Sequence, residues 1–405
     1  MESYQALFTP LALNHKHQLA NRFVLSPMVT NSSSKDGKVS QEDLDYAVRR
    51  AGSAPLQITG AAYIQEEGQL FEYGFSVAAD ADVEGLSALA CAMQSKGAKA
   101  ILQLTHAGRF ASHALQRDRV VYGPSAMSLQ SPFPHQVKEL TVAEIDEIIE
   151  AYGQATRRAI EAGFAGVEIS SAQRLLLQTF FSTFSNQRND QYGCQDLDSR
   201  SRLGLSVLRR VQQVIDRYGP EGFILGFRAT PEETRGSSIG YSVEEFLAFM
   251  EQALEVASID YLALASWGHD VFRNRVRSPG VFQGQLVNQV VHEALKGRVW
   301  VMASGGINSA DKALEALNSS DFVGASTPFI TDPEFVEKIA LGRAEEIRLT
   351  IRPEDLAGLA IPQASFKDIV PLMDYGESLP EESRNLFREL RVNYKEEIGE
   401  KTAKT

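Results

Sequence analysis

The sequence predicts an α/β protein: a single TIM (β/α)8 barrel domain with a C-terminal helical extension. Three observations support this fold class. Short apolar and β-branched runs alternate with longer helical patterns, eight such runs occur, and polar or small residues follow several of them. Alternating strands and helices are typical of βαβ units and a parallel sheet. We expect the barrel to occupy residues 1–350 and the extension residues 351–405.

The eight predicted strands are spread along the whole predicted barrel. They are residues 22–27, 56–61, 99–104, 166–169, 223–228, 260–264, 298–302 and 321–323. Polar or small side chains stand at or just after the ends of four of them, at Gln103, Ser170, Arg228 and Ser304. A TIM barrel builds its site at the carboxyl ends of its strands, so these side chains should lie there.

The segments between the strands have helical spacing. In residues 141–162 the periodic apolar residues are Val142, Ile145, Ile148, Ile149 and Tyr152. Thr141 and Glu144 have the spacing of a capping box at the start of this helix. A doubly wound sheet is the competing topology. It is disfavoured because no G-x-G-x-x-G motif follows the first strand.

The alternation of strands and helices stops at about residue 350. The acidic segment 379–383 then leads into a helical stretch that ends in Lys- and Glu-rich residues. Such an extension can fold back on its own barrel or cover the site of a neighbouring subunit. The sequence leaves both arrangements open, and with them a homo-oligomer.

The composition is that of an acidic globular protein. The chain has 405 residues, 40 Lys and Arg against 52 Asp and Glu, and a formal net charge of −12. Its hydrophobic fraction of 43% suffices for a large core, which excludes disorder of the whole chain. Because the basic residues form no stripe, we expect a small-molecule partner and no nucleic acid.

Cysteine and histidine usage points to a reducing compartment. Cys91 and Cys194 are far apart and the seven histidines are dispersed, so we expect no disulfide framework and no metal site. Residues 1–20 lack the pattern of a secretory leader, and no apolar run reaches the length of about 18–20 residues that a membrane span needs. We therefore expect a cytoplasmic protein without a membrane partner.

Two strand ends carry groups that suit a planar ligand. In the segment 103–109, Gln103, His106 and Arg109 could donate hydrogen bonds to a heteroaromatic ring, or His106 and Arg109 could simply hold the loop. Arg228 ends an apolar strand, where a cation needs an anionic or electron-rich partner. That partner is either Glu168 or Asp190 in a structural ion pair, or the negatively charged N1–C2 edge of a reduced flavin.

Two later strand ends suit a phosphate. Residues 303–307, Ala-Ser-Gly-Gly-Ile, lie between a strand and a helix, where the late loops of a barrel expose backbone N–H groups. Residues 323–327, Val-Gly-Ala-Ser-Thr, add two hydroxyls at the next strand. A glycine pair alone usually marks only a turn, but the two segments together predict a phosphate site.

Ordered motifs over about residues 5–350 resemble the old yellow enzyme family of FMN oxidoreductases. The matching segments are Phe8–Leu11, Asn21–Met28, Asp36–Val39, Gln103–Arg109, Ala162–Ile169, Phe180–Ser182, Ser185–Arg188, Asp190–Gly193, Arg200–Arg202, Ser304–Gly306 and Asp332–Pro333. The resemblance implies a TIM barrel that holds FMN at its C-terminal mouth. It also implies that NADH or NADPH reduces the FMN and that an electron-poor acceptor reoxidises it.

The resemblance also implies a set of site residues. The cofactor-binding residues would be Ser26, Pro27, Met28 and Val29 under the flavin, Ala61 and Gln103 at its pyrimidine edge, Arg228 beside N1, and Gly305, Gly306, Ser326 and Thr327 around the phosphate. Ser170 and Gln173 would take the catalytic place of the family's pair of donors to the acceptor. Asn31 and Leu175 would contact the substrate. Trp267 follows the sixth predicted strand, where it either contacts the substrate at the mouth or packs within its loop.

Several of these positions depart from the family pattern. Ser170 and Gln173 replace the family's His-x-x-His or His-x-x-Asn pair, and Leu175 replaces the Tyr that often donates a proton. Val29 replaces a polar Thr or Cys, and Thr327 replaces the Arg that grips the phosphate. Without the charge-assisted bonds of that Arg, the affinity for FMN should be lower than is usual in the family.

The sequence therefore predicts an FMN-dependent oxidoreductase that passes hydride from NADH or NADPH to an enone, a quinone or a similar acceptor through an atypical substrate site. The missing donor pair and Tyr lead us to expect quinones to be turned over better than alkenes. The alternative is a non-catalytic barrel, with weakened or lost FMN binding, that acts as a binding or regulatory module. Retention of Gln103, Arg109 and Arg228 favours the enzyme.

Overall fold

The computed structural model describes residues 2–362, 366 and 369–390. The predicted TIM barrel is confirmed: eight parallel strands form a closed ring, because β10 pairs with both β11 and β6. In ring order these are β3 (Phe23–Leu25), β4 (Leu56–Ile58), β6 (Lys99–Thr105), β10 (Gly166–Ser171), β11 (Ile224–Ala229), β14 (Tyr261–Leu264), β15 (Trp300–Ser304) and β16 (Phe322–Ala325). Each predicted strand overlaps one of them.

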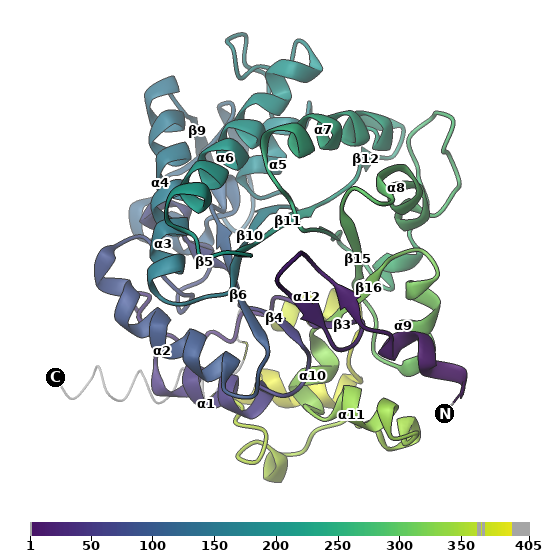
Figure 1. Cartoon of the computed structure of the whole chain (residues 1–405). Helices are drawn as coiled ribbons and strands as arrows, with labels where there is room; N and C mark the ends of the chain where they lie inside the picture. The colour runs from purple at the N-terminus through teal and green to yellow at the C-terminus, as the bar shows by residue number, and fades with distance from the viewer. Residues whose placement is uncertain (1, 363–365, 367–368, 391–405) are drawn as a thin grey trace, which may run out of the picture.

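Helices surround the strands (Figure 1). The longer ones are α1 (Gln41–Arg50), α2 (Val83–Gln94), α4 (Val142–Glu161), α6 (Leu197–Tyr218), α7 (Val243–Val256), α8 (Val287–Leu295) and α9 (Ala310–Leu317). The shorter ones are α3 (Ser112–Asp118), α5 (Leu176–Phe181), α10 (Thr327–Thr331), α11 (Phe335–Ala340) and α12 (Val370–Gly376). Short 3-10 helices occupy Glu2–Phe8, Glu66–Gly68, Asp80–Asp82, Gly108–Phe110, Val271–Arg273, Ala344–Glu346 and Pro353–Asp355.

Helix α4 follows its sequence signals closely. Thr141 Oγ1 accepts a hydrogen bond from the Glu144 N–H over 3.2 Å, and the Glu144 carboxylate accepts one from the Thr141 N–H over 2.7 Å, so the predicted capping box is confirmed. Ile145, Ile148 and Tyr152 are buried on its inner face. Their burial ties the helix to the sheet, because an amphipathic helix gains most of its stability from packing.

Small sheets are added to the barrel. They consist of the hairpin β1 (Leu11–Ala12) and β2 (Gln18–Leu19), the strand β5 (Ala62–Tyr63) beside β6, the sheet of β7 (Val121–Gly123), β8 (Met127–Leu129) and β9 (His135–Glu139), and the hairpin β12 (Glu233–Arg235) and β13 (Ser238–Tyr241). Leu11 and Leu19 of the first hairpin share an apolar cluster with Ile101 and Met302 of the barrel. This purple hairpin crosses the ring in Figure 1 and closes its amino end, which leaves the carboxyl end for a ligand.

The described part of the predicted extension packs on its own barrel. Phe366, Ile369 and Met373 lie in one apolar cluster with Val29, just after β3, and with Ile330 of α10. Residues 363–365, 367–368 and 391–405 of the extension lie outside the described residues. The domain boundary at residue 350 and a homo-oligomer stay predictions. In the part of the chain that the structure describes, no helix is both long and apolar enough to cross a bilayer.

Candidate functional site

A cavity of about 410 Å³, here called the main cavity, opens at the carboxyl ends of the strands. Its volume lies in the range of about 300–1,000 Å³ that is usual for ligand pockets. The predicted residues that line it are Ser26, Pro27, Met28, Val29, Ala61, Gln103, Ser170, Gln173, Leu175, Arg228, Trp267, Gly305, Gly306, Ser326 and Thr327. Asn31 does not line it: the side chain is fully buried and its φ is +58°. The individual roles of these residues stay predictions.

One buried carboxylate organises the polar wall of the main cavity. Glu168, in β10, has no exposed surface and accepts hydrogen bonds from Arg228 Nε over 2.7 Å, from Gln103 Nε2 over 2.7 Å and from the Tyr261 hydroxyl over 3.1 Å. Burial raises the pKa of Tyr261 well above its ordinary value, so this hydroxyl is a donor. Glu168 thereby orients both cavity-lining groups, Arg228 and Gln103.

The ion pair proposed as one role for Arg228 is thus present, with Glu168 as the partner. Asp190 instead pairs with Arg188, at 2.5 Å between Arg188 Nη2 and the carboxylate. Arg228 is 6% exposed, yet it still lines the main cavity. The ion pair therefore leaves this cation available at the cavity wall, and the two roles are compatible.

Ser26 offers an unsatisfied polar atom. It follows β3, and its Oγ is buried without a hydrogen-bond partner among the described residues. Its backbone is fixed by a hydrogen bond from its N–H to the Ala325 carbonyl over 2.8 Å. Because a buried hydroxyl without a partner costs free energy, Ser26 Oγ fits a site whose ligand supplies that partner.

Gly305 and Gly306 are required by the local backbone. Their φ angles are +89° and +86°, a region that residues with a Cβ rarely adopt. A Cβ on Gly306 would lie 2.5 Å from Asp270 Oδ1, and one on Gly305 would lie 2.7 Å from Val271 Cβ. The glycines therefore let the loop after β15 pack tightly against the loop after β14.

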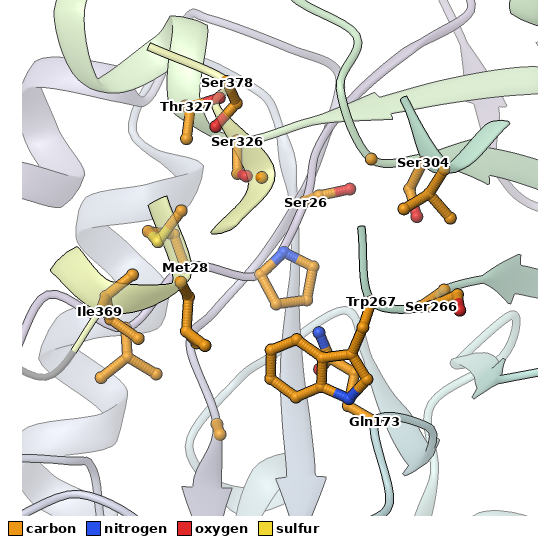
Figure 2. Close-up of a pocket in the computed structure, with 18 of the residues that line it drawn as sticks. Ser26, Met28, Gln173, Ser266, Trp267, Ser304, Ser326, Thr327, Ile369 and Ser378 are labelled. Carbon is orange, nitrogen blue, oxygen red and sulfur yellow. The ribbon is translucent and has the colours of Figure 1, made fainter. Parts of the chain in front are cut away.

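One end of the main cavity is rich in hydroxyls. Figure 2 shows Ser326, Thr327 and Ser378 together there, with Ser26 nearer to the middle. Arg228 is the one cation among the described lining residues. Two nearby cations are already paired, since Asp270 binds Lys312 Nζ over 2.7 Å and Arg273 Nη1 over 2.6 Å. A phosphate at this end would depend on hydroxyls and backbone N–H groups.

The other end carries the predicted substrate contacts. Figure 2 places Gln173, Ser266 and Trp267 there. Gln173 has a φ of +58°, and its N–H donates to Thr230 Oγ1 over 3.2 Å. Leu175, at the start of α5, is 6% exposed and contributes only an apolar surface.

Sequence reasoning missed the C-terminal wall of the main cavity. Ile369, Leu372, Met373, Tyr375, Gly376 and Ser378 all line it. Ser378 is held against the loop after β15, because Asn308 Nδ2 donates to its carbonyl over 3.0 Å. A usable signal was present: Phe366, Ile369, Val370 and Met373 have the i, i+3, i+4, i+7 spacing of a helical face.

His106 and Arg109 support the loop and do not line the main cavity. His106 Nδ1 accepts a hydrogen bond from the Gly108 N–H over 3.0 Å, and burial lowers the pKa of His106 to about 4, so its ring is neutral. Burial also lowers the pKa of Arg109 to about 10. The Arg109 guanidinium lies 5.3 Å from the centre of the Phe110 ring. The interpretation of both residues as loop supports holds.

The lining of the main cavity fits a flavin. Pro27, Met28 and Ala61 provide an apolar surface for a planar ring, while Gln103 and Arg228 supply polar groups at the wall. Ser26 Oγ has no hydrogen-bond partner among the described residues, so it can bond to a ligand. The hydroxyl-rich end can donate hydrogen bonds to a phosphate group. Among the described residues no cluster of His, Cys, Asp and Glu could hold a metal ion.

Comparison with known proteins agrees with this chemistry. A family model described as "NADH:flavin oxidoreductase / NADH oxidase family" matches residues 6–346. An uncharacterized oxidoreductase of Streptococcus pyogenes serotype M5 (strain Manfredo) is 67% identical over 98% of this chain and 99% of its own length. A protein of Bacillus subtilis (strain 168), named as a probable NADH-dependent flavin oxidoreductase, is 31% identical over 91% of this chain and 96% of its own.

A solved structure of morphinone reductase in complex with tetrahydroNAD has a TM-score of 0.68 and 28% identity, and covers 84% of this chain and 91% of that one. These proteins give no support to a non-catalytic barrel. The match over residues 6–346 shows that this chain belongs to the NADH:flavin oxidoreductase / NADH oxidase family, as an FMN-dependent enzyme of the old yellow enzyme type that takes its electrons from NADH or NADPH.

Proposed function

We propose that this enzyme passes hydride to a small electron-poor acceptor through an atypical substrate site, and that it reduces quinones faster than alkenes. The observation that carries the proposal is that Ser170, Gln173 and Leu175 all line the main cavity. By the resemblance, they would stand there in place of the donor pair and the proton-donating Tyr. A cytoplasmic location remains part of the proposal.

When bound, FMN supplies a two-electron carrier that accepts hydride from the nicotinamide and releases it to the acceptor. Glu168 holds the Arg228 guanidinium at the cavity wall, where its positive charge would favour the electron-rich form of the cofactor. Gln103 would address the same edge through its carbonyl oxygen or its second Nε2 hydrogen, because one Nε2 hydrogen already goes to Glu168. Ser26, Ser326 and Thr327 would donate to the remaining polar atoms of the cofactor.

The acceptor preference follows from where the proton must go. Ser170 and Gln173 can donate hydrogen bonds to an acceptor oxygen and orient it. A quinone needs protons only on oxygen, which water or a hydroxyl delivers quickly. An alkene needs a proton on carbon, and Leu175 has none to give. A positioned general acid contributes about 100-fold or more to such a step, so alkene reduction should suffer most.

The test begins with the visible spectrum of the purified protein, recorded before and after addition of FMN and desalting. Anaerobic NADH and NADPH titrations follow, and then turnover of benzoquinone and cyclohexenone under the same conditions. We expect bound flavin that bleaches with a nicotinamide, and quinone turnover that exceeds cyclohexenone turnover by about 100-fold. Equal rates with the two acceptors would refute the atypical site, whereas colourless protein that refuses FMN would refute the whole mechanism.

A further inference from the structure

A second cavity, of about 170 Å³, adjoins the main one; we call it the arginine cavity. The two cavities share a wall formed by Ala265, Ser266, Trp267, Val271 and Tyr375. Ser266 and Trp267 belong to the loop at the right of Figure 2. A ligand that occupies the substrate end of the main cavity therefore has the arginine cavity on the other side of this loop.

Three guanidinium groups line the arginine cavity, at Arg174, Arg275 and Arg277. Among the described residues, no carboxylate lies within ion-pair distance of Arg275 or Arg277. Arg275 Nη1 donates to the Gly284 carbonyl over 2.8 Å, which leaves its charge uncompensated. The cavity thus contains two cations without an acidic partner in a chain whose formal net charge is −12.

The two glutamates of the arginine cavity are already engaged. Glu232 accepts hydrogen bonds from the backbone N–H groups of Arg277 and Ser278, over 2.8 and 3.1 Å. Glu233 is shared between Arg235, at 3.1 Å, and Arg174, at 3.8 Å. The local balance of charge is therefore positive, and such a site attracts anions.

A buried amide without a partner is part of the same cavity. Asn288, in the first turn of α8, is 3% exposed, and its Nδ2 has no hydrogen-bond partner among the described residues. A buried N–H donor without an acceptor costs free energy, and a ligand oxygen would remove that cost. Asn288 therefore points, independently of the arginines, to a ligand rich in oxygen acceptors.

We propose that the arginine cavity binds the pyrophosphate of the reduced nicotinamide dinucleotide while the nicotinamide ring occupies the main cavity. This inference rests on the proposed use of the main cavity as the site of hydride transfer. The pyrophosphate is separated from the nicotinamide by one ribose, so it must leave the main cavity near the ring. The adjoining cavity provides the charges and donors that a pyrophosphate needs, since guanidinium groups bind phosphate through charge-assisted pairs.

The experiment compares two hydride donors. NADH carries the pyrophosphate, whereas 1-benzyl-1,4-dihydronicotinamide carries only the nicotinamide ring. The variants are Arg277→Gln, whose side chain makes no hydrogen bond or ion pair to the described residues, and the double variant Arg275→Gln with Arg277→Gln. Arg209→Gln is the matched control, because Arg209 is an exposed arginine of α6 that lines neither cavity. Reduction is followed by anaerobic stopped-flow bleaching of the flavin.

A binding measurement without redox chemistry accompanies the kinetics. ADP-ribose contains the pyrophosphate and lacks the nicotinamide, and its affinity for each variant is measured by isothermal titration calorimetry. We expect the double variant to weaken both NADH and ADP-ribose binding by about tenfold or more, the scale of one or two charge-assisted contacts. Reduction by 1-benzyl-1,4-dihydronicotinamide should stay unchanged, and Arg209→Gln should resemble the wild type throughout.

The outcomes separate this inference from the proposed function. If the double variant slows both donors equally, or leaves NADH and ADP-ribose binding unchanged, the arginine cavity is not the pyrophosphate site. If it weakens only the binding of an anionic acceptor, the cavity belongs to the acceptor and the inference is again overturned. If neither donor bleaches the flavin of the wild type, the proposed function itself fails, while ADP-ribose binding still tests the cavity.

Discussion

Arg228 Nε donates a hydrogen bond to Glu168 Oε1 over 2.7 Å, and both side chains are buried on neighbouring strands of the barrel. The register places Arg228 opposite Ser170, so the ion pair and the predicted acceptor contact lie at the same level of the barrel. Glu168 has no contact with the solvent, which means that its charge depends on its donors for stability. One carboxylate therefore links the fold to the cofactor edge of the main cavity.

Replacing this carboxylate should destabilise the fold. Glu168→Gln leaves Arg228 buried without its anion, so we expect the free energy of unfolding to fall by about 3 kcal/mol. Tyr261→Phe is the control, because it removes one hydrogen bond to Glu168 without changing a charge and should cost about 1 kcal/mol. Urea unfolding of both variants measures the difference. Equal losses would show that the ion pair contributes no more than a neutral hydrogen bond.

Replacing the arginine tests its proposed effect on the flavin. Arg228→Ala removes the positive charge beside the proposed N1 edge, so we expect weaker FMN retention on desalting and a lower midpoint potential. Arg228→Lys keeps the charge without the planar group and should lie between the alanine variant and the wild type. Spectroscopic redox titration of each variant provides the measurement. Flavin retention and potential like those of the wild type in Arg228→Ala would remove Arg228 from the cofactor site.

The sequence allowed the barrel to be predicted because its strands and helices have strong local signals. The capping box of Thr141 and Glu144 and the apolar runs of the strands do not depend on distant contacts. The site residues could be assigned because they stand at strand ends, which a closed barrel brings to one mouth. The Glu168–Arg228 pair could be given only as one of two choices, since spacing does not decide between two carboxylates.

The remaining parts of the site depend on tertiary packing. Tyr375 and Ser378 reach the main cavity only because α12 folds back on its own barrel. The sequence did not decide between this arrangement and one in which the extension covers the site of a neighbouring subunit. Asn31 was expected near the substrate only because the family resemblance implies it. Its left-handed backbone instead turns it into the interior, which no local periodicity indicates.

Gly306→Ala should disrupt the packing between two loops of the main cavity. The new Cβ would lie 2.7 Å from Asp270 Cα, and the backbone would be strained at a φ of +86°. Gly297→Ala is the matched control, since Gly297 has a φ of +78° and no atom within 4 Å of the added Cβ. We expect both variants to lose about 1 kcal/mol from backbone strain, but only Gly306→Ala to lose affinity for FMN. Fluorescence titration of FMN into the apoprotein decides, and equal affinities would show that this contact does not shape the site.

Leu175→Tyr should shift the acceptor preference toward alkenes. A phenol at the start of α5 would supply the proton donor that the proposed substrate site lacks. Leu175→Phe has a similar ring without the hydroxyl, so it controls for the change of volume in the cavity. We expect the ratio of cyclohexenone to benzoquinone turnover to rise at least tenfold in the Tyr variant. This is about one tenth of the roughly 100-fold acceleration that a well-positioned general acid provides. The same rise in Leu175→Phe would assign the effect to shape.

His106 should make stability depend on pH, because burial lowers its pKa from 6.5 to about 4. Between these values the unfolded chain binds a proton that the folded chain does not, so stability present above pH 6.5 is lost as the pH falls toward 4. The full loss is about 3 kcal/mol. Asp260 acts in the opposite direction, because burial raises its pKa to about 6 and its contribution is lost as the pH rises.

The wild-type curve therefore mixes two opposing titrations, and a difference between variants is needed to isolate His106. His106→Asn keeps an acceptor for the Gly108 N–H but cannot be protonated. We measure the free energy of unfolding in urea and subtract the value of the variant from that of the wild type. We expect this difference to be constant above pH 7 and to decrease steadily as the pH falls from 6.5 to 4. The corresponding difference for Asp260→Asn, wild type minus variant, should instead increase as the pH falls from about 6 to 3.8. If the difference for His106→Asn in the free energy of unfolding does not vary with pH, the buried ring is protonated at no extra cost. Burial would then not control the charge of His106.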